Sequence, residues 1–259
     1  MIRIHPDLTD DELLRLFDKG IRAQWTQDAI DWSGAASIPE AKRRALADVI
    51  TPVYLGEQTA MVGISTVLPM VLNRGMAEAG LYLSSMGLDE ARHFHNLHQL
   101  YDLLGQEPLP RRRLPEMFRY HARLLARREP TEWVWGILIS DLFAKRFYGG
   151  FVERFPDTLV GRLSARTLQD EARHQAFSDR YLTRMLPTMT PEGRQALLDM
   201  RDDLFRVIEV LGGRLRPAMD ELEWSPEEFI AGLWADTERW ARRLHVKPGE
   251  AVEAPEPEA

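Results

Sequence analysis

The pentapeptide Asp-Glu-Ala-Arg-His occurs twice in the chain, at 89–93 and at 170–174. In a helix, residues three apart project from nearly the same face, so the Glu and the His of each copy point together. A carboxylate and an imidazole one turn apart can bind one metal ion, and two such pairs that face each other can bind two. The pairs are Glu90 with His93 and Glu171 with His174.

Nearly the whole sequence is typical of helix, because apolar residues recur at intervals of three and four, as they do from Met200 to Leu211. A capping box at Thr9–Glu12 predicts one helix start. Three more starts are predicted where a capping side chain precedes a proline, at Thr51-Pro52, Thr190-Pro191 and Ser225-Pro226. Junctions are expected where glycine and proline cluster, at 105–110, 155–157 and Gly212-Gly213.

Four of the expected helices cover 52–72, 77–104, 131–154 and 158–186. A short break separates the helices within each pair, which predicts two antiparallel helical hairpins. We therefore expect an all-α protein with a single domain over 1–246 and a bundle core at about 50–186. The segment 247–259 is rich in Pro, Glu and Ala, and we expect it to be a disordered acidic tail.

The first helix of each hairpin carries one carboxylate in an otherwise apolar run, Glu57 in the first hairpin and Asp141 in the second. An ionised carboxylate in a dry interior is costly unless a cation or a proton accompanies it. Glu57 and Glu90 are equidistant from the break at 73–75. Asp141 and Glu171 are equidistant from the break at 155–157, so each lone acid should be level with a Glu-His pair.

These observations predict two metal ions held by four carboxylates and two imidazoles, an oxygen-rich set suited to iron or manganese. Asp141 is the weakest member, because its side chain is one methylene shorter than that of glutamate and could reach its metal through water. Acidic and basic residues at helical spacing also form simple solvated faces, and an ion-pair network is the structural alternative. The predicted ligands are Glu57, Glu90, His93, Asp141, Glu171 and His174.

The doubled motif and its lone partners resemble the ferritin-like di-metal carboxylate superfamily over roughly 50–186. The resemblance implies a ferritin-like four-helix bundle with additional N- and C-terminal helices, and Glu57, Glu90, Asp141 and Glu171 as the catalytic carboxylates. It also implies two iron ions, with Mn/Fe and Mn/Mn as alternatives, and dioxygen as co-substrate. In that superfamily the aspartate before each glutamate often holds a metal-bound histidine, a role that would fall to Asp89 and Asp170. Arg92 and Arg173 are expected to pair with acidic neighbours.

Three subfamily patterns of that clan are not matched. The radical tyrosine of ribonucleotide reductase small subunits would stand at Leu97. The cross-linked tyrosine of the related ligand-binding oxidases would stand at Gly136, and the extra histidine of arylamine N-oxygenases at Thr167. The pair Trp25 and Trp32 resembles the tryptophan-bearing N-terminal helix of reductase relatives, although such residues are most often core.

Two functional classes follow from the resemblance. One is a diiron oxidase or monooxygenase that activates dioxygen to oxidise a small organic substrate. The other is a bacterioferritin-like ferroxidase that handles iron, and a third alternative is a degenerate bundle used as a scaffold. The length of 259 residues favours the first, because additional helices on both sides of the bundle can enclose a substrate pocket.

The chain has no cysteine, which excludes disulfides, thiolate metal sites and cysteine nucleophiles. Its formal net charge of −7 argues against a nucleic-acid partner. No signal peptide is apparent, and the longest uncharged stretch, 58–73, is too short to span a membrane, so we expect a cytoplasmic protein. The expected partners are a ferredoxin- or flavin-reductase-type electron donor and a second copy in a homodimer.

Other candidates carry less weight. His95 and His98 follow His93 too closely to share its face, and we expect them at the surface or just outside the metal ligands. The arginine-rich segment 111–128 could bind an anionic partner, but a solvated helical face is the simpler interpretation.

Overall fold

The computed structural model describes residues 6–33 and 38–246, and within these ranges it contains eight α-helices and no strand. The all-α prediction is therefore confirmed. The α-helices are α1 (Asp11–Arg22), α2 (Glu40–Asn73), α3 (Ala77–Leu104), α4 (Pro115–Leu125), α5 (Pro130–Arg154), α6 (Leu159–Met185), α7 (Pro191–Glu221) and α8 (Pro226–Arg243). The short 3₁₀ turns are η1 (Gln27–Ala29), η3 (Arg111–Arg113) and η4 (Leu186–Thr188).

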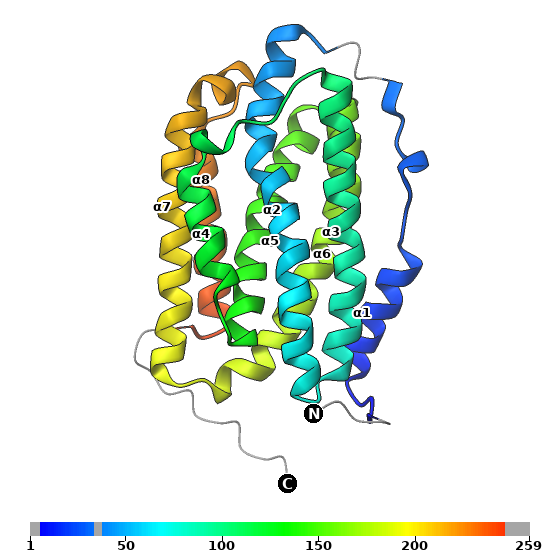
Figure 1. Cartoon of the computed structure of the whole chain (residues 1–259), viewed down its shortest axis with the longest axis vertical. Helices are drawn as coiled ribbons and strands as arrows, with labels where there is room; N and C mark the ends of the chain where they lie inside the picture. Colours follow the sequence, from blue (N-terminus) through cyan, green and yellow to red (C-terminus); the bar gives the residue numbers. More distant parts are fainter. Residues whose placement is uncertain (1–5, 34–37, 247–259) are drawn as a thin grey trace.

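The core of the molecule is a four-helix bundle made of two hairpins. Helix α2 packs along α3, and α5 packs along α6, with the second hairpin lying against the first (Figure 1). The break between α2 and α3 contains Gly75 at a φ of +79°, a conformation that glycine adopts without a steric penalty. The break between α5 and α6 lies at 155–158, where Thr158 caps α6 by accepting from the N–H of Gly161. Both hairpins thus turn where the sequence predicts.

The remaining helices cover opposite sides of this bundle (Figure 1). Helix α1 packs on α3 and α6, whereas α7 packs on α2, α5, α8 and α4. The expected additional N- and C-terminal helices are thereby confirmed. Helices α4 and α7 both approach α2 from outside the bundle, so the side of α2 that faces away from α3 is enclosed by them.

Two of the predicted helix starts are confirmed and one is displaced. Thr190 and Ser225 each cap a helix that begins with proline, and their side chains accept from the N–H groups of Gly193 and Glu228. At the N-terminus the cap is Asp10 rather than Thr9, because the Asp10 side chain accepts from Leu13 N at 3.2 Å.

The predicted helix start at Thr51-Pro52 is wrong, since both residues lie inside α2. The eleven residues before Thr51 continue the helix because they supply a buried apolar face that includes Leu46 and Ile50. The Thr51 hydroxyl is not a cap but donates to the carbonyl of Ala47 at 2.7 Å and contacts the Tyr101 hydroxyl of α3 at 2.9 Å. Tertiary packing thus extends α2 through its proline.

The predicted junction at Gly212-Gly213 is also wrong, because α7 runs through it. A Cβ built on Gly212 would lie 3.1 Å from Cδ1 of Ile230. The glycine therefore permits a close contact between α7 and α8 rather than a turn. The single domain over 1–246 stays a prediction. The predicted tail at 247–259 lies outside the described residues.

Helix α2 has, by length and composition alone, the properties of a membrane span, with a mean hydropathy of 1.2 over 18 residues. It is the one such helix within 6–33 and 38–246. Within the structure 28% of this window is buried, and α2 packs along α3 as one helix of the four-helix core.

Candidate metal centre

The six predicted ligands converge in the middle of the bundle, one or two from each core helix. Glu57 comes from α2 and Asp141 from α5, while α3 and α6 contribute the Glu-His pairs. All six side chains are buried, each at 6% exposure or less. Their ligand atoms form two groups within 4.8 Å, and Glu90 belongs to both. The groups are Glu57, Glu90, His93 and Glu171, and Glu90, Asp141 and His174.

Nδ1 of each histidine faces the carboxylates. Nδ1 of His93 lies 3.6 Å from Glu57 Oε2, 3.7 Å from Glu90 Oε2 and 3.6 Å from Glu171 Oε1. Nδ1 of His174 lies 3.3 Å from Glu90 Oε1 and 3.6 Å from Glu171 Oε2. Glu90 and Glu171 thus lie between the two imidazoles, and each has a carboxylate oxygen near Nδ1 of both histidines.

The opposite ring nitrogen of each histidine contacts an aspartate of the other motif. Nε2 of His93 lies 3.1 Å from Asp170 Oδ2, and Nε2 of His174 lies 3.3 Å from Asp89 Oδ2. Burial raises the pKa of both aspartates, but the hydrogen bonds and charges of these histidines outweigh it. As a result, the pKa of Asp89 falls to about 2 and that of Asp170 falls well below its ordinary value.

An ionised carboxylate only accepts hydrogen bonds, so each histidine must donate to its aspartate through Nε2. This hydrogen bond leaves Nδ1 as the atom directed at the carboxylate cluster. It is the arrangement by which a partner outside the ligand set fixes the tautomer and orientation of a metal-binding histidine. Asp89 and Asp170 therefore lie where the resemblance implies, each crossing to the other hairpin's histidine.

Two arginines and two side chains of the N-terminal segment surround these aspartates. Arg92 pairs with Asp170 at 2.8 Å and also with Asp89, while Arg173 pairs with Asp89 at 3.0 Å and also with Asp170. The indole N–H of Trp25 donates to Asp170 Oδ2 at 2.9 Å. Gln24 donates to Asp89 Oδ1 at 2.8 Å. The N-terminal segment is thus tied to both motifs.

Protons accumulate in the cluster when no cation balances its charge. Burial raises the pKa of Glu90 to about 8, and the charges of Glu57 and Glu171 add to the rise. Burial also raises the pKa of Asp141 well above its ordinary value. Burial alone would lower the pKa of both histidines, but their carboxylate partners raise it well above the usual range. Without metal, therefore, Glu90, Asp141 and both imidazoles bind protons more tightly than the same groups do in water.

Unpaired buried atoms test whether these residues suit a metal. Nδ1 of both histidines, Asp141 Oδ2 and Glu171 Oε2 have no hydrogen-bond partner among the described residues. Folded proteins rarely leave buried polar atoms unpaired. All four atoms are metal-ligand types and all four lie in the cluster, and divalent cations placed among them would satisfy them. The donor set fits iron or manganese, and metal binding by these residues remains a prediction.

Tyr148 of α5 belongs to this site, although the sequence did not single it out. Its hydroxyl donates to Glu57 Oε1 at 2.8 Å, and burial raises the pKa of Tyr148 well above its ordinary value. The pKa of Glu57 is lowered: burial raises it, but the adjacent His93 imidazole lowers it by more, and the hydrogen bond from Tyr148 adds to the lowering. Tyr148 lies seven residues after Asp141, two helical turns along the same face, and this spacing was the available signal.

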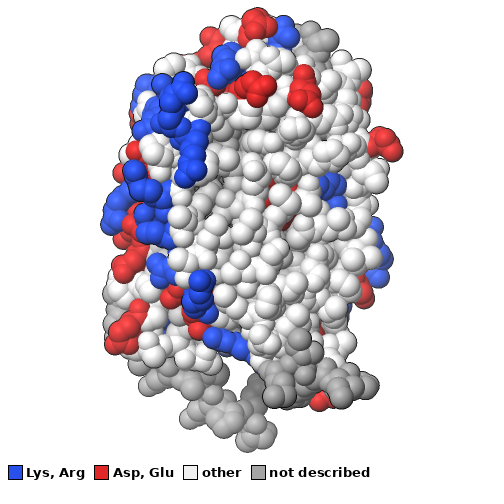
Figure 2. Space-filling view, viewed as in Figure 1, with Lys and Arg blue, Asp and Glu red and all other residues white. Residues whose placement is uncertain are grey.

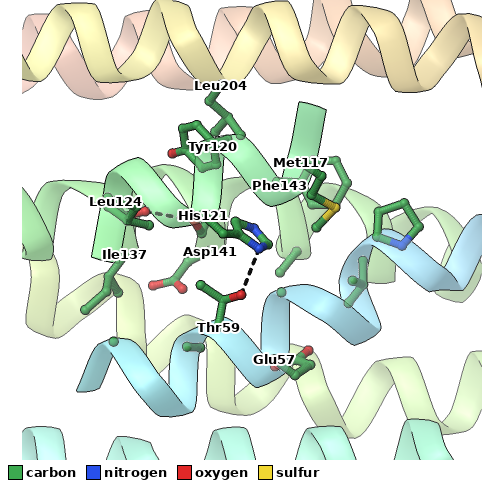
Figure 3. Close-up of a pocket in the computed structure, with 18 of the residues that line it drawn as sticks. Glu57, Thr59, Met117, Tyr120, His121, Leu124, Ile137, Asp141, Phe143 and Leu204 are labelled. Carbon is green, nitrogen blue, oxygen red and sulfur yellow. Dashed lines mark hydrogen bonds between the residues drawn. The ribbon is translucent and has the colours of Figure 1, made fainter. Parts of the chain in front are cut away.

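A pocket opens beside the cluster, with an empty volume of about 980 Å³ including the part open to solvent. The part of its wall nearest the metal-ligand cluster is lined by Glu57, Glu90, Asp141 and Glu171. The rest of its wall is mainly apolar and comes from α2, α4, α5 and α7 (Figure 3). Apolar residues in that wall include Val53, Met117, Leu124, Ile137, Phe143, Leu204, Val207 and Ile208.

The secondary candidates lie outside the cluster. His98 contacts the Tyr54 hydroxyl at 2.9 Å through Nδ1, and His95 contacts Gln27 at the surface. Trp32 donates to the carbonyl of Gln27. In the arginine-rich segment, Arg123 pairs with Asp203 and Arg127 with Glu132. Figure 2 shows basic side chains along the edge of α4 and α7, whereas the face over α2 and α3 is largely uncharged.

Comparisons with known proteins find the same fold among solved structures. An R2-like ligand-binding oxidase from Sulfolobus acidocaldarius matches with a TM-score of 0.62 and 17% identity, over 84% of this chain and 93% of that one. An R2-like ligand-binding oxidase with an aerobically reconstituted Mn/Fe cofactor matches with a TM-score of 0.68 and 16% identity, over 94% and 98% of the two chains. The chain therefore has the ferritin-like fold of these R2-like ligand-binding oxidases. No protein-family model matches the sequence, and no curated protein does.

The packing around Gly136 bears on the tyrosine that the ligand-binding-oxidase pattern would place there. A Cβ there would lie 2.8 Å from Cδ1 of Leu124 and 3.4 Å from Cε of Met200. Helix α4 and helix α7 therefore occupy the space that a tyrosine at this position would need.

Proposed function

We propose that this protein is a di-metal oxidase or monooxygenase that uses dioxygen to oxidise a small, mainly apolar organic molecule. The observation that carries the proposal is the convergence of six buried ligand side chains, with unpaired atoms at their centre, beside an apolar pocket. The similarity in fold to R2-like ligand-binding oxidases supports it.

In this proposal the six side chains hold two iron ions, or one manganese and one iron. When bound, such a pair would supply redox chemistry: it would give electrons to dioxygen and would take electrons from the substrate and from a reductant. The chain's own residues prepare the site. Asp89 and Asp170 keep each imidazole oriented with Nδ1 inward, and Tyr148 holds one oxygen of Glu57.

The pocket would hold the substrate against Glu57 and Asp141. Its apolar wall excludes water from the reacting group, which limits side reactions of a strong oxidant. Helices α4 and α7 supply much of that wall, and neither belongs to the four-helix core. This use of additional helices favours substrate oxidation over simple iron storage.

We further propose a homodimer in the cytoplasm, reduced by a ferredoxin- or flavin-reductase-type donor. The test begins with metal analysis of protein purified without oxygen, followed by optical and electron paramagnetic resonance spectra on exposure to dioxygen. We expect about two redox-active metal ions per chain and a spectral change on oxygen addition. Protein that takes up no iron or manganese under these conditions would contradict the proposal.

A further inference from the structure

His121 lies in the pocket but not in the metal cluster. It comes from α4, and Figure 3 shows it directed at Thr59 of α2, with Asp141 and Glu57 in the same pocket. Its Nδ1 lies 2.8 Å from Thr59 Oγ1. The sequence had offered no reason to single out this histidine, because it stands alone on an otherwise ordinary amphipathic helix.

The contacts of Thr59 fix which nitrogen of His121 carries a proton. The Thr59 hydroxyl has one proton, and it donates this proton to the carbonyl of Leu55 at 3.0 Å. Towards His121 the same oxygen can therefore only accept. Nδ1 of His121 must donate, so in the neutral ring Nε2 carries a lone pair.

Burial keeps this ring neutral, because it lowers the pKa of His121 to about 4. Among the described residues, the His121 imidazole makes one hydrogen bond, through Nδ1 to Thr59. Nε2 therefore has no hydrogen-bond partner there. Ser140, another polar residue of the pocket, donates its proton to the carbonyl of Gly136. Nε2 of His121 is thus a fixed acceptor in a mainly apolar wall.

We propose that Nε2 of His121 accepts a hydrogen bond from the substrate, and that the substrate is an apolar molecule carrying a hydroxyl or N–H group. This inference rests on the proposed function and names the substrate class for the same pocket. A hydroxyl or N–H group of the substrate could donate to Nε2 of His121, whereas the lone pairs of an ether or carbonyl oxygen would face the lone pair of that nitrogen. A carboxylate at this position would be repelled for the same reason.

The first test measures binding rather than oxidation. Three probes with the same unbranched ten-carbon chain differ in their polar end: 1-decanol donates, decyl methyl ether only accepts, and decanoate is an anion. Their dissociation constants are measured by calorimetry on the full-length chain, both metal-loaded and after chelator treatment. A neutral hydrogen bond predicts that the alcohol binds about three- to tenfold more tightly than the ether.

Matched variants assign this preference to one atom. In His121→Phe the alcohol and the ether should bind with about equal affinity, and the affinity for the ether should change little, because only a hydrogen bond is lost. Tyr120→Phe changes the adjacent pocket residue and should keep the preference. The proposal would be overturned if Tyr120→Phe lost the preference for the alcohol over the ether, or if His121→Phe kept it. It would also be overturned if decanoate bound most tightly or if no probe bound.

A second variant tests the tautomer. Thr59→Val removes the acceptor for Nδ1, so the proton should move to Nε2 and the preference should reverse towards the ether. Nitrogen-15 spectra of the imidazole should show Nδ1–H in the unmodified chain and Nε2–H in the variant. An unmodified chain with Nε2–H, or a variant that still prefers the alcohol, contradicts the proposal. These readouts need no turnover, so they can fail while the oxidase function holds, and the reverse.

Discussion

At the scale of single residues, the decisive property of the cluster is that it needs positive charge. Four carboxylates share one buried volume, and Glu90 and Asp141 respond with raised pKa values. Protons fill the role that we assign to metal ions. Metal uptake should therefore compete with protons and strengthen as pH rises.

This competition predicts how the stability of the metal-free chain depends on pH. Glu90 titrates near 4.5 when unfolded and at about 8 when folded, so the folded state binds the extra proton between these values. Its stabilising contribution is complete below pH 4.5 and is lost as pH rises through 8. Urea unfolding of chelator-treated protein at pH 5, 6.5 and 8 should show stability falling steadily. Glu90→Gln should make the fall shallower without abolishing it, because Asp141 and both histidines also have raised pKa values. An equally steep fall in that variant would contradict this origin.

Removing a ligand should abolish metal binding without unfolding the chain. Glu90→Ala or Glu171→Ala takes out one buried acid, and the remaining groups can protonate or pair with each other. Metal content by mass spectrometry should fall to background and oxygen consumption should stop, while circular dichroism stays unchanged. Glu132→Ala is the control, since Glu132 is on the same bundle and pairs with Arg127. A fully metallated Glu90→Ala protein would remove Glu90 from the ligand set.

Asp89 and Asp170, which accept hydrogen bonds from the two histidines, should strengthen metal binding without being required for it. Asp89→Asn and Asp170→Asn keep the shape of the side chain but lose the charge that holds the imidazole tautomer. Metal affinity, measured by competition with a chelator, should weaken by about 10–100-fold. Asp102→Asn, on the exposed part of α3, should leave affinity unchanged. Unchanged affinity in both inner variants would mean that the histidines are oriented by other contacts.

The convergence of the six candidate ligands could be predicted because the motif is doubled and its spacing places the two lone carboxylates level with it. Tyr148 and His121 could not, because their roles depend on what faces them. Tyr148 acts on Glu57 of another helix, and His121 acquires its tautomer from Thr59 of α2. When the role of a side chain depends on a residue of another helix, the sequence around it contains no pattern that predicts the role.

At the scale of the elements, adjacent glycines of α5 differ in what surrounds them. A Cβ on Gly150 would lie 2.4 Å from Cζ2 of the buried Trp224, whereas one on Gly149 would meet nothing within 4 Å. Gly150→Ala should destabilise the chain by about 1–3 kcal/mol through overpacking. Gly149→Ala should stabilise it by about 0.5–1 kcal/mol, because alanine favours helix. Thermal melting of the two variants checks both signs, and equal shifts would show that Trp224 moves freely.

The same contrast explains which elements could be predicted. Hairpin positions could be predicted because the first break contains Gly75, which has a positive φ, and the second contains Pro156 in an exposed turn. The errors at Thr51-Pro52 and Gly212-Gly213 arose because packing against neighbouring helices outweighed local signals. A glycine pair looks the same in sequence whether it ends a helix or admits Ile230.

At the scale of the whole molecule, the proposed oxidase differs from an iron store in assembly and stoichiometry. A storage protein forms a hollow shell and oxidises many iron ions per chain. We expect light scattering to give a dimer, the commonest soluble assembly, and iron titration to end at about two per chain. Repeated turnover of dioxygen should then require both a reductant and an organic substrate. A large shell that mineralises iron well beyond this ratio would favour the ferroxidase alternative.

The crossing of the aspartates has a consequence for how the molecule can be divided. Asp89 holds the histidine of α6, and Asp170 holds the histidine of α3. Reciprocal contacts of this kind define an isologous interface, in which each half supplies the same patch to the other. The two hairpins are related as the subunits of a twofold dimer are, although one chain contains both. An isolated hairpin would lack half of the ligands and also the group that orients the histidine it retains.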